Sequence, residues 1–352
     1  MDKFKSSKEI VNSMGVGWNL GNSLDSYSPW ITSNNPTDYE MSWGNPVTTK
    51  AMIDKVVEGG FRTIRIPVTW DTHIGEAPDY KINDAWMKRV KEVVNYAISN
   101  NVYVILNLHH EDNWLIPSLE KEAEVTNKLE KIWFQIAYEF INYNDHLLFE
   151  SFNEVREKGS PLEWMGGTKE GRAIANRYNA TAVKTIRNTG GNNSKRSILI
   201  PTYAASGSYE AIKDLIIPNS KNIIVSIHDY FPYNFAMNCS DEYATDKWGS
   251  IDDKKELIER LNSFYYTFVL RGIPVIIGEF GSTNKDNLSY RVEHAKSFIS
   301  YAKKRHIGCI WWDNNSNSIG AENFGLFDRD ALNWYHPEIH NALINSYNNT
   351  SI

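Results

Sequence analysis

Short runs of apolar, β-branched and aromatic residues recur along the chain, and each is followed by a stretch in which apolar residues return at helical spacing. Runs of this kind are typical of buried strands, whereas the helical repeat indicates amphipathic helices. Clear helical stretches cover residues 48–60, 84–100 and 287–306. The predicted strands are residues 15–22, 61–68, 101–110, 146–154, 197–203, 222–230, 274–281 and 307–314.

The strict alternation of strand and helix predicts the fold class. It implies parallel strands joined by right-handed crossovers, and eight such units close into a barrel more naturally than they extend as an open sheet. We therefore predict an α/β protein with a single (β/α)₈ TIM barrel. An open doubly wound sheet is the alternative, but no G-x-G-x-x-G motif follows the first strand. No linker, repeat or low-complexity tract divides the sequence, so we predict one domain over residues 1–352.

Polar or aromatic residues stand at the carboxyl end of nearly every predicted strand. In a (β/α)₈ barrel these ends meet at one face, where active sites are built. A barrel with a purely structural role would have no reason to gather them there. The residues are Asn19, Asn22, Trp70, His109, His110, Asn153, Glu154, Tyr203, His228, Tyr230, Glu279, Trp312, Asp313 and Asn314.

Two of these strand ends carry a glutamate, Glu154 after Asn153 and Glu279 in "GEFG". Paired carboxylates across a barrel mouth suit the cleavage of a glycosidic bond, in which one protonates the leaving oxygen and the other attacks or activates water. A single glutamate at such a place would as readily cap a helix or form an ion pair. Two of them with amide and aromatic neighbours favour the catalytic hypothesis.

Three further side chains are expected to support this pair. Arg65 lies within a barrel strand and needs a carboxylate partner, for which Glu279 and Glu150 are both candidates. His228 and Tyr230 are two residues apart and leave the same face of their strand, so they could hydrogen-bond the two catalytic carboxylates. A histidine packed in the core is the alternative for His228.

The adjacent His109 and His110 raise the question of a metal site. Neighbouring strand residues point to opposite faces, so we expect that the two cannot share an ion, and no second histidine pair or cysteine cluster accompanies them. We therefore expect neither a catalytic metal nor another cofactor.

Aromatic residues are abundant where the active face is expected. Trp312 would form a flat apolar wall that can stack on the C–H face of a sugar ring. Other aromatics fall in the long predicted loops of the same face, as expected of a groove for an extended sugar chain. They are Tyr27, Trp30, Tyr39, Trp43, Trp114, Trp164, Phe231, Tyr233, Trp248, Phe324 and Trp334.

Composition and charge limit the classes of binding partner that we expect. The net charge is −6, the pI is near 5.9 and no basic block occurs, so we expect no nucleic-acid partner. No apolar run is long enough to cross a bilayer, so no membrane association is expected, and the start "MDKFKSSKEI" lacks the apolar core of a signal peptide. The two cysteines, Cys239 and Cys309, cannot form a disulfide framework or a cysteine zinc site.

Several motifs together resemble the glycoside hydrolase family 5 endoglucanases, in particular the clostridial cellulase type. They keep the order of that family over nearly the whole chain, from about Gly15 to Arg329. The motifs are "GWNLGNSLD", "WGNPVTT", "RIPVTW", "NLHHE", "FESFNE", "IHDYFPY", "IIGEFG", "WWDN" and "FGLFDR".

The resemblance implies a retaining endo-β-1,4-glucanase that forms a covalent glycosyl-enzyme intermediate, with carboxyls about 5–5.5 Å apart. It implies that Glu154 is the general acid/base, Glu279 the nucleophile and Asn153 a ligand of the sugar 2-hydroxyl. It places Arg65, His109, His110, His228, Tyr230 and Trp312 around the cleavage point. Asn22, at the polar end of the first predicted strand, is a further expected substrate-binding residue. One departure is Val155, where the family usually has proline, which removes a backbone constraint but no reacting group.

Substrate and location are expectations that follow from this resemblance. Cellulose-like β-glucan is the expected partner, with xyloglucan, mixed-linkage glucan, mannan or xylan as alternatives, and a non-catalytic glycan-binding barrel or a metal-dependent hydrolase as more distant ones. Because polymeric glucans lie outside cells, we expect a secreted, monomeric catalytic domain whose signal peptide is absent from this sequence and which could belong to a larger modular protein.

The stretch "LLFESFNEVR", residues 147–156, makes one local prediction. Regular alternation would send Asn153 and Glu154 to opposite faces, so the strand must bulge or turn for both to reach one sugar. We expect this irregularity next to Val155, where the backbone should be least rigid.

Overall fold

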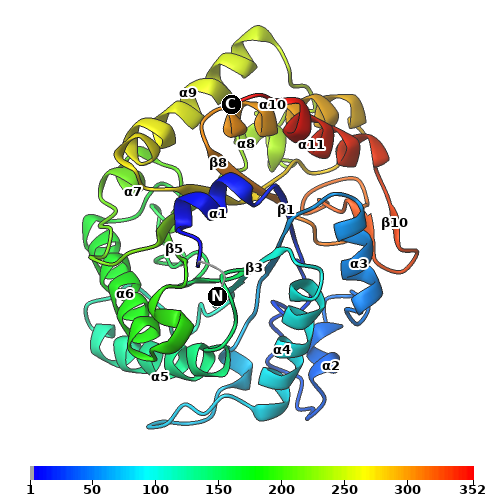
Figure 1. Ribbon diagram of the computed structural model, residues 1–352. Coiled ribbons are helices and arrows are strands. Elements are labelled where there is room, and N and C mark those ends of the chain that lie inside the picture. The colour runs from blue at the N-terminus through cyan, green and yellow to red at the C-terminus, as the bar shows by residue number, and fades with distance from the viewer. Residues whose placement is uncertain (1–3) are drawn as a thin grey trace.

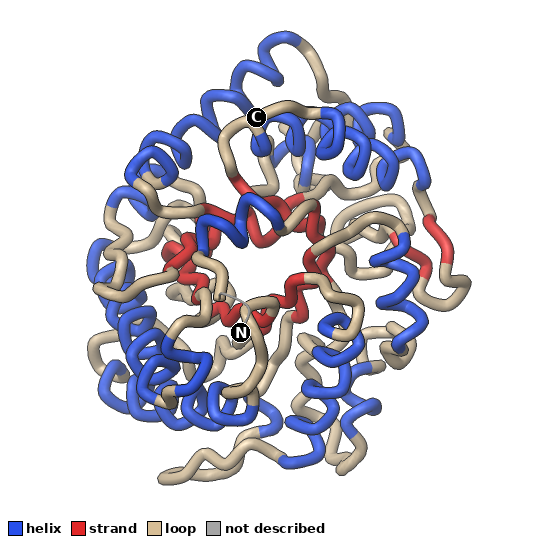
Figure 2. The backbone as a smooth tube through the Cα atoms, in the orientation of Figure 1, coloured by secondary structure: helices blue, strands red, loops and turns tan. Residues whose placement is uncertain are grey.

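The computed structural model describes residues 4–352, and within them eight parallel strands close into a barrel that is surrounded by helices (Figure 1). Figure 2 shows the strands as an inner ring and most helices outside it. Each strand overlaps one of the predicted segments, so the predicted TIM barrel is confirmed. The strands are β1 (Val16–Asn19), β2 (Thr63–Ile66), β3 (Tyr103–Asn107), β4 (Leu147–Glu150), β5 (Ile198–Ser206), β6 (Ile223–His228), β7 (Val275–Phe280) and β8 (Ile307–Trp311).

The helices follow the predicted amphipathic stretches, and polar side chains begin several of them. The side chain of Thr49 accepts the N–H of Met52 at the start of α3, and that of Asn83 accepts two N–H groups at the start of α4. Among residues 4–352, no helix combines the length and the apolar character needed to cross a membrane. The helices are α1 (Ser7–Ser13), α2 (Pro36–Glu40), α3 (Lys50–Glu58), α4 (Asp84–Ile98), α5 (Glu122–Glu139), α6 (Lys169–Asn188), α7 (Tyr209–Lys213), α8 (Tyr233–Ala236), α9 (Ile251–Thr267), α10 (Leu288–Lys303) and α11 (Pro337–Asn349).

The two ends of the barrel differ. At the amino-terminal end of the strands, α1 lies across the opening (Figure 1), and Ile10, Val11 and Met14 pack against inward-facing strand residues such as Ile105 and Leu199. This apolar plug closes one end of the barrel core. The carboxyl ends of the strands are therefore left to carry the open face.

The predicted strands extend too far at the polar end in several places. β3 ends at Asn107 and β4 at Glu150, so the polar residues after them belong to the following loops. β5 instead continues to Ser206 through a register shift, with Ala204 and Ala205 at positive φ. Side-chain alternation therefore fails at the places where the polar residues of this face lie.

Candidate active site

A cavity of about 770 Å³ opens at the carboxyl ends of the strands. Of the predicted site residues, Arg65 lies beneath the cavity and all the others line it. The lining residues from that set are Asn22, His109, His110, Asn153, Glu154, His228, Tyr230, Glu279 and Trp312. The structure therefore gathers at one place the residues that the sequence placed at separate strand ends.

Of the predicted loop aromatics, Trp43, Trp164 and Tyr233 line the cavity, whereas others such as Trp248 and Phe324 are buried in packing. Sequence reasoning missed six lining residues: Ala204, Ser206, Gly207, Met237, Arg260 and Glu322. The first three belong to or follow the irregular end of β5, which a strand prediction that stopped at residue 203 could not include. The others lie in loops or on a distant helix and carry no local signal.

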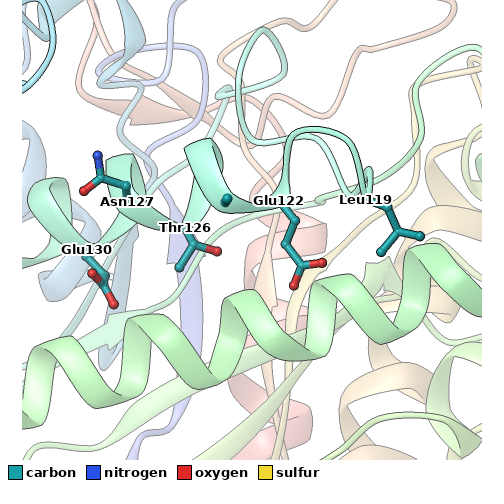
Figure 3. Close-up of a pocket in the computed structure, with 6 residues that line it drawn as sticks. Leu119, Glu122, Thr126, Asn127 and Glu130 are labelled. Atoms are coloured by element: carbon teal, nitrogen blue, oxygen red, sulfur yellow. The ribbon is translucent and has the colours of Figure 1, made fainter.

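A second hollow, of about 590 Å³, lies on the outside of the barrel where α5 faces α6 (Figure 3). Residues of α5 and of the turn before it line it, among them Leu119, Glu122 and Glu130. It contains none of the predicted site residues, so the chemistry belongs to the barrel mouth.

Arg65 binds both of its candidate partners. Its Nε donates to Glu150 Oε2 at 2.8 Å, and its Nη1 donates to Glu279 Oε1 at 2.8 Å. Its Nη2 donates to Asn153 Oδ1 at 2.8 Å. Burial opposes the charge of this guanidinium, but the two carboxylates outweigh burial and raise the pKa of Arg65. Arg65 thus fixes one oxygen of Glu279 and orients the amide of Asn153.

The second carboxylate, Glu150, is fully buried and has a partner for each of its oxygens. Ser226 Oγ donates to its Oε1 at 2.6 Å, and Asn107 Nδ2 donates to its Oε2 at 3.1 Å. The sequence indicated a role for neither Asn107 nor Ser226. Because Glu150 does not line the cavity, we assign it to holding Arg65 rather than to reaction with a substrate.

Glu154 and Glu279 face each other with His228 beside them. One oxygen of each carboxylate and one nitrogen of His228 lie within 4.8 Å of one another. Inverting glycosidases need carboxyl groups about 6.5–9.5 Å apart to admit a water molecule, whereas retaining enzymes hold them about 5–5.5 Å apart. The arrangement therefore matches direct attack by one carboxylate on a bound sugar.

His228 and Tyr230 contact the carboxylates as the sequence suggested. His228 Nδ1 lies 2.7 Å from Glu154 Oε1 and 3.5 Å from Glu279 Oε2, and the Tyr230 hydroxyl donates to Glu279 Oε2 at 2.9 Å. Burial and the charge of Glu279 raise the pKa of Tyr230, which keeps its donor proton.

The protonation of His228 and Glu154 is linked through their hydrogen bond. Burial lowers the pKa of His228, but the charge of Glu279 and the bond to Glu154 outweigh it, so that pKa lies above 6.5. Burial raises the pKa of Glu154, but His228 outweighs burial and that pKa is lowered. The two groups therefore titrate as a coupled pair that shares the proton of this hydrogen bond.

We expect His228→Gln to change the pH dependence of stability. Because folding raises the pKa of His228, its favourable contribution is complete below the unfolded value of 6.5 and is lost as the pH rises through the folded value. The difference in unfolding free energy between wild type and variant should therefore shrink above pH 6.5. Urea unfolding between about pH 5.5 and pH 9 measures it, and a difference that grows with pH would contradict the assignment.

The predicted irregularity after β4 is present. The strand ends at Glu150, the N–H of Asn153 donates to the C=O of Leu108 at 2.8 Å, and the side chains of Asn153 and Glu154 both line the cavity. Val155 is buried and its C=O accepts the N–H of Ala204 at 3.0 Å. Packing and this hydrogen bond hold the backbone where the family usually has a proline ring.

The argument that His109 and His110 point to opposite faces was wrong. Both follow the end of β3, so strand alternation does not apply, and both line the cavity with nitrogens within 4.8 Å of an oxygen of Asp25. The two oxygens of Asp25, however, accept the N–H groups of Asn22 and Ser23. Burial and positive neighbours lower the pKa of His109 well below its ordinary value, so its imidazole ring is uncharged.

The other acidic cluster, Glu154, His228 and Glu279, is also close enough for ion ligation. Both oxygens of Glu279 and one oxygen of Glu154 already have partners within the protein, because Glu279 binds Arg65 and Tyr230 while Glu154 binds His228. The fixed charge of Arg65 opposes a cation at this position. These residues therefore fit acid–base chemistry better than metal binding. The absence of a catalytic metal stays a prediction.

Trp312 forms one wall of the cavity. Its ring lies parallel to that of His109, with ring centroids 5.9 Å apart and an interplanar angle of 2°. Gly21 of "NLGNS" permits this position, because a side chain there would come within 2.8 Å of the Trp312 ring. The cavity thus combines a flat apolar wall with a polar floor, which matches the two faces of a sugar ring.

Comparisons with known proteins identify the family of this chain. The sequence profile of the family Cellulase (glycosyl hydrolase family 5) matches residues 24–318. Endoglucanase A of Clostridium longisporum is 52% identical over 347 residues, which cover 98% of this chain but 66% of that protein. The chain thus spans just under two thirds of this relative's length.

Solved structures are also similar. A GH5-4 broad specificity endoglucanase from the same Clostridium has a TM-score of 0.96 and 50% identity, with 99% of this chain and 100% of that chain covered. One from Ruminococcus champanellensis, with bound cellotriose, has a TM-score of 0.93 and 46% identity, with 97% of this chain and 99% of that chain covered. The chain therefore belongs to glycoside hydrolase family 5, the family that its motifs resemble.

Proposed function

We propose that this chain is a retaining endo-β-1,4-glucanase that hydrolyses internal bonds of cellulose-like glucans. The observation that carries the proposal is the approach of Glu154 and Glu279 to within 4.8 Å, with Arg65 holding one oxygen of Glu279. Membership of family 5 supports the retaining mechanism, and the cellotriose bound to a similar structure supports a β-glucan substrate.

In this mechanism Glu279 attacks the anomeric carbon while Glu154 gives its proton to the leaving oxygen. A covalent glycosyl–Glu279 ester forms and the leaving chain departs with that proton. Glu154 then removes a proton from water, which attacks the same carbon and releases Glu279. Asn153, oriented by Arg65, binds the 2-hydroxyl of the sugar, and Tyr230 holds the second oxygen of Glu279.

The choice of polysaccharide depends on the loops around the cavity. Xyloglucan, mixed-linkage glucan, mannan and xylan are alternatives that use the same chemistry, and the similar structures are described as broad in specificity. A non-catalytic glycan-binding barrel is disfavoured because both carboxylates are present and correctly spaced. Product analysis on a panel of soluble β-glucans, mannan, xylan and xyloglucan tests the proposal, and an absence of cleavage on every polymer would refute it.

A metal-dependent hydrolase is tested separately. We expect activity to survive excess chelator, because the proposed chemistry uses side chains of the chain itself. Turnover of a soluble β-glucan with and without chelator measures this. Loss of activity that a divalent cation restores would favour the metal-dependent alternative.

We further propose that residues 1–352 form one catalytic domain that acts outside the cell on polymeric glucan as a monomer. The greater length of Endoglucanase A of Clostridium longisporum fits a module within a larger protein. Gel filtration would test whether the protein is a monomer, and detection of the protein in culture medium would test whether it is secreted.

A further inference from the structure

The loop after Glu154 carries an arginine that connects three parts of the active face. Arg156 Nη1 donates to the backbone C=O of Glu154 at 2.9 Å, and its Nε donates to Glu163 Oε1 at 2.8 Å. Its Nη1 also lies 3.3 Å from Asp112 Oδ1, in the loop after β3. The side chain is only 12% exposed, so this guanidinium has a fixed position between two loops.

The same guanidinium lies over an aromatic ring of the cavity wall. The centre of the Arg156 guanidinium is 4.4 Å from the centroid of Trp164. Trp164 lines the cavity, yet its side chain is 56% exposed and sits in a loop. A planar cation stacked on an indole restrains its orientation, and this restraint matters most where little else packs against the ring.

Trp164 stands opposite the other aromatic wall. Trp312 and Trp43 follow β8 and β1, whereas Trp164 follows β4, which lies across the closed ring of eight strands from β8. Glu154 and Glu279 line the same cavity as these aromatic side chains. An extended sugar chain that passes the catalytic pair would therefore meet an aromatic surface at each end.

The position of Glu154 indicates on which side of the cleaved bond Trp164 contacts the sugar chain. The leaving oxygen must lie within hydrogen-bond reach of the group that protonates it. Glu154 is that group in the proposed function, and Trp164 comes from the loop that follows it. The sugar attached to the leaving oxygen is thus assigned to the side of the cavity that the segment after β4 lines with Glu154 and Trp164.

We propose that Arg156 is a positioning residue that holds Trp164 as a stacking platform for the glucosyl unit on the leaving-group side. This inference rests on the proposed function, because it assigns sides from the role of Glu154. Through its bond to the Glu154 carbonyl, Arg156 also sets the distance between the platform and the acid/base. The ligand it serves is an unsubstituted pyranose face, which is apolar enough to stack on indole.

The test compares a substrate that has a glucosyl leaving group with one that lacks it. Trp164→Ala should raise KM for cellohexaose about tenfold, and Arg156→Ala about fivefold, as expected for loss of an aromatic contact and of its cation–π restraint. For 2,4-dinitrophenyl β-cellobioside, whose leaving group needs neither stacking nor a proton, kcat/KM should stay within about twofold. Unchanged activity on this substrate also shows that the variants are folded.

Three further variants sharpen the result. Lys158→Ala is the matched control, because Lys158 pairs with the same Asp112 at 3.2 Å, whereas the cation over the Trp164 ring is that of Arg156, so the kinetics of Lys158→Ala should match wild type. Arg156→Lys keeps the charge without the planar stack and should fall between wild type and Arg156→Ala. The Arg156→Ala, Trp164→Ala double variant should be no worse than Trp164→Ala alone.

Equal losses on both substrates, additive losses in the double variant, or an unchanged KM for cellohexaose would each overturn the role of Arg156. A wild-type protein inactive on both substrates would refute the proposed function instead. The affinity of the same variants for cellohexaose, measured by calorimetry, would then decide whether Arg156 acts through Trp164.

Discussion

Replacing Glu279 with glutamine should lower turnover of every β-glucan by roughly four orders of magnitude while leaving the barrel folded. Glutamine keeps the shape of the side chain and an acceptor for Arg65, but it cannot form the glycosyl ester. Steady-state rates on a soluble β-glucan and on 2,4-dinitrophenyl β-cellobioside measure the effect. Both substrates should be affected equally, because both need the nucleophile.

The smaller variant Glu279→Gly tests the same role of Glu279 by restoring activity with an added nucleophile. Azide can enter the space left by the side chain and attack the activated cellobioside from the nucleophile side, which gives an α-glycosyl azide. Glu150→Gln is the matched control, since Glu150 also binds Arg65 but does not line the cavity. It should cost stability and still turn over substrate, whereas near-normal activity of Glu279→Gln would remove Glu279 from its role.

Replacing Glu154 with alanine should have an effect that depends on the leaving group. For cello-oligosaccharides kcat/KM should fall by about 10²–10⁴-fold, because the departing sugar oxygen needs a proton. For 2,4-dinitrophenyl β-cellobioside, kcat/KM should change little while kcat falls, because the glycosyl–Glu279 ester forms but water is no longer activated. Pre-steady-state measurement should show a burst of dinitrophenol.

Azide also distinguishes the acid/base role of Glu154 from the nucleophile role of Glu279. In Glu154→Ala it should accelerate release of the intermediate and give a β-glycosyl azide, the opposite anomer to that expected from Glu279→Gly. Equal losses of kcat/KM on good and poor leaving groups would contradict the acid/base role. The two variants together thus identify which carboxylate works on which face of the sugar.

Local sequence patterns were sufficient for most of the fold. The eight strands could be predicted because a run of β-branched and aromatic residues bounded by helix signals is a local property. The positions of Glu154 and Glu279 at strand ends were informative for the same reason, once a barrel was assumed. Helix starts were also local, as the capping side chains of Thr49 and Asn83 illustrate.

Strand ends were predicted less well, and the error had consequences. The prediction carried β3 through His110, whereas the strand stops at Asn107, so the two histidines were wrongly assigned to opposite faces. A strand ends where a side chain or a neighbouring loop accepts hydrogen bonds from its backbone N–H groups in place of the next strand. After the end of β2, for example, the side chain of Asn107 accepts the N–H of Val68 at 3.1 Å. Such partners lie far away in the sequence.

By itself, the sequence determined the family, the order of strands and helices, and the two carboxylates with their amide and aromatic neighbours. Only the tertiary structure decided that Arg65 binds Glu150 and Glu279 together, that Asn107 and Ser226 support this arrangement, and that Arg156 reaches Trp164. The physical reason is that periodicity reports which face a residue takes on its own element. Distances between side chains from different strands are set by closure of the barrel and by the loops above it.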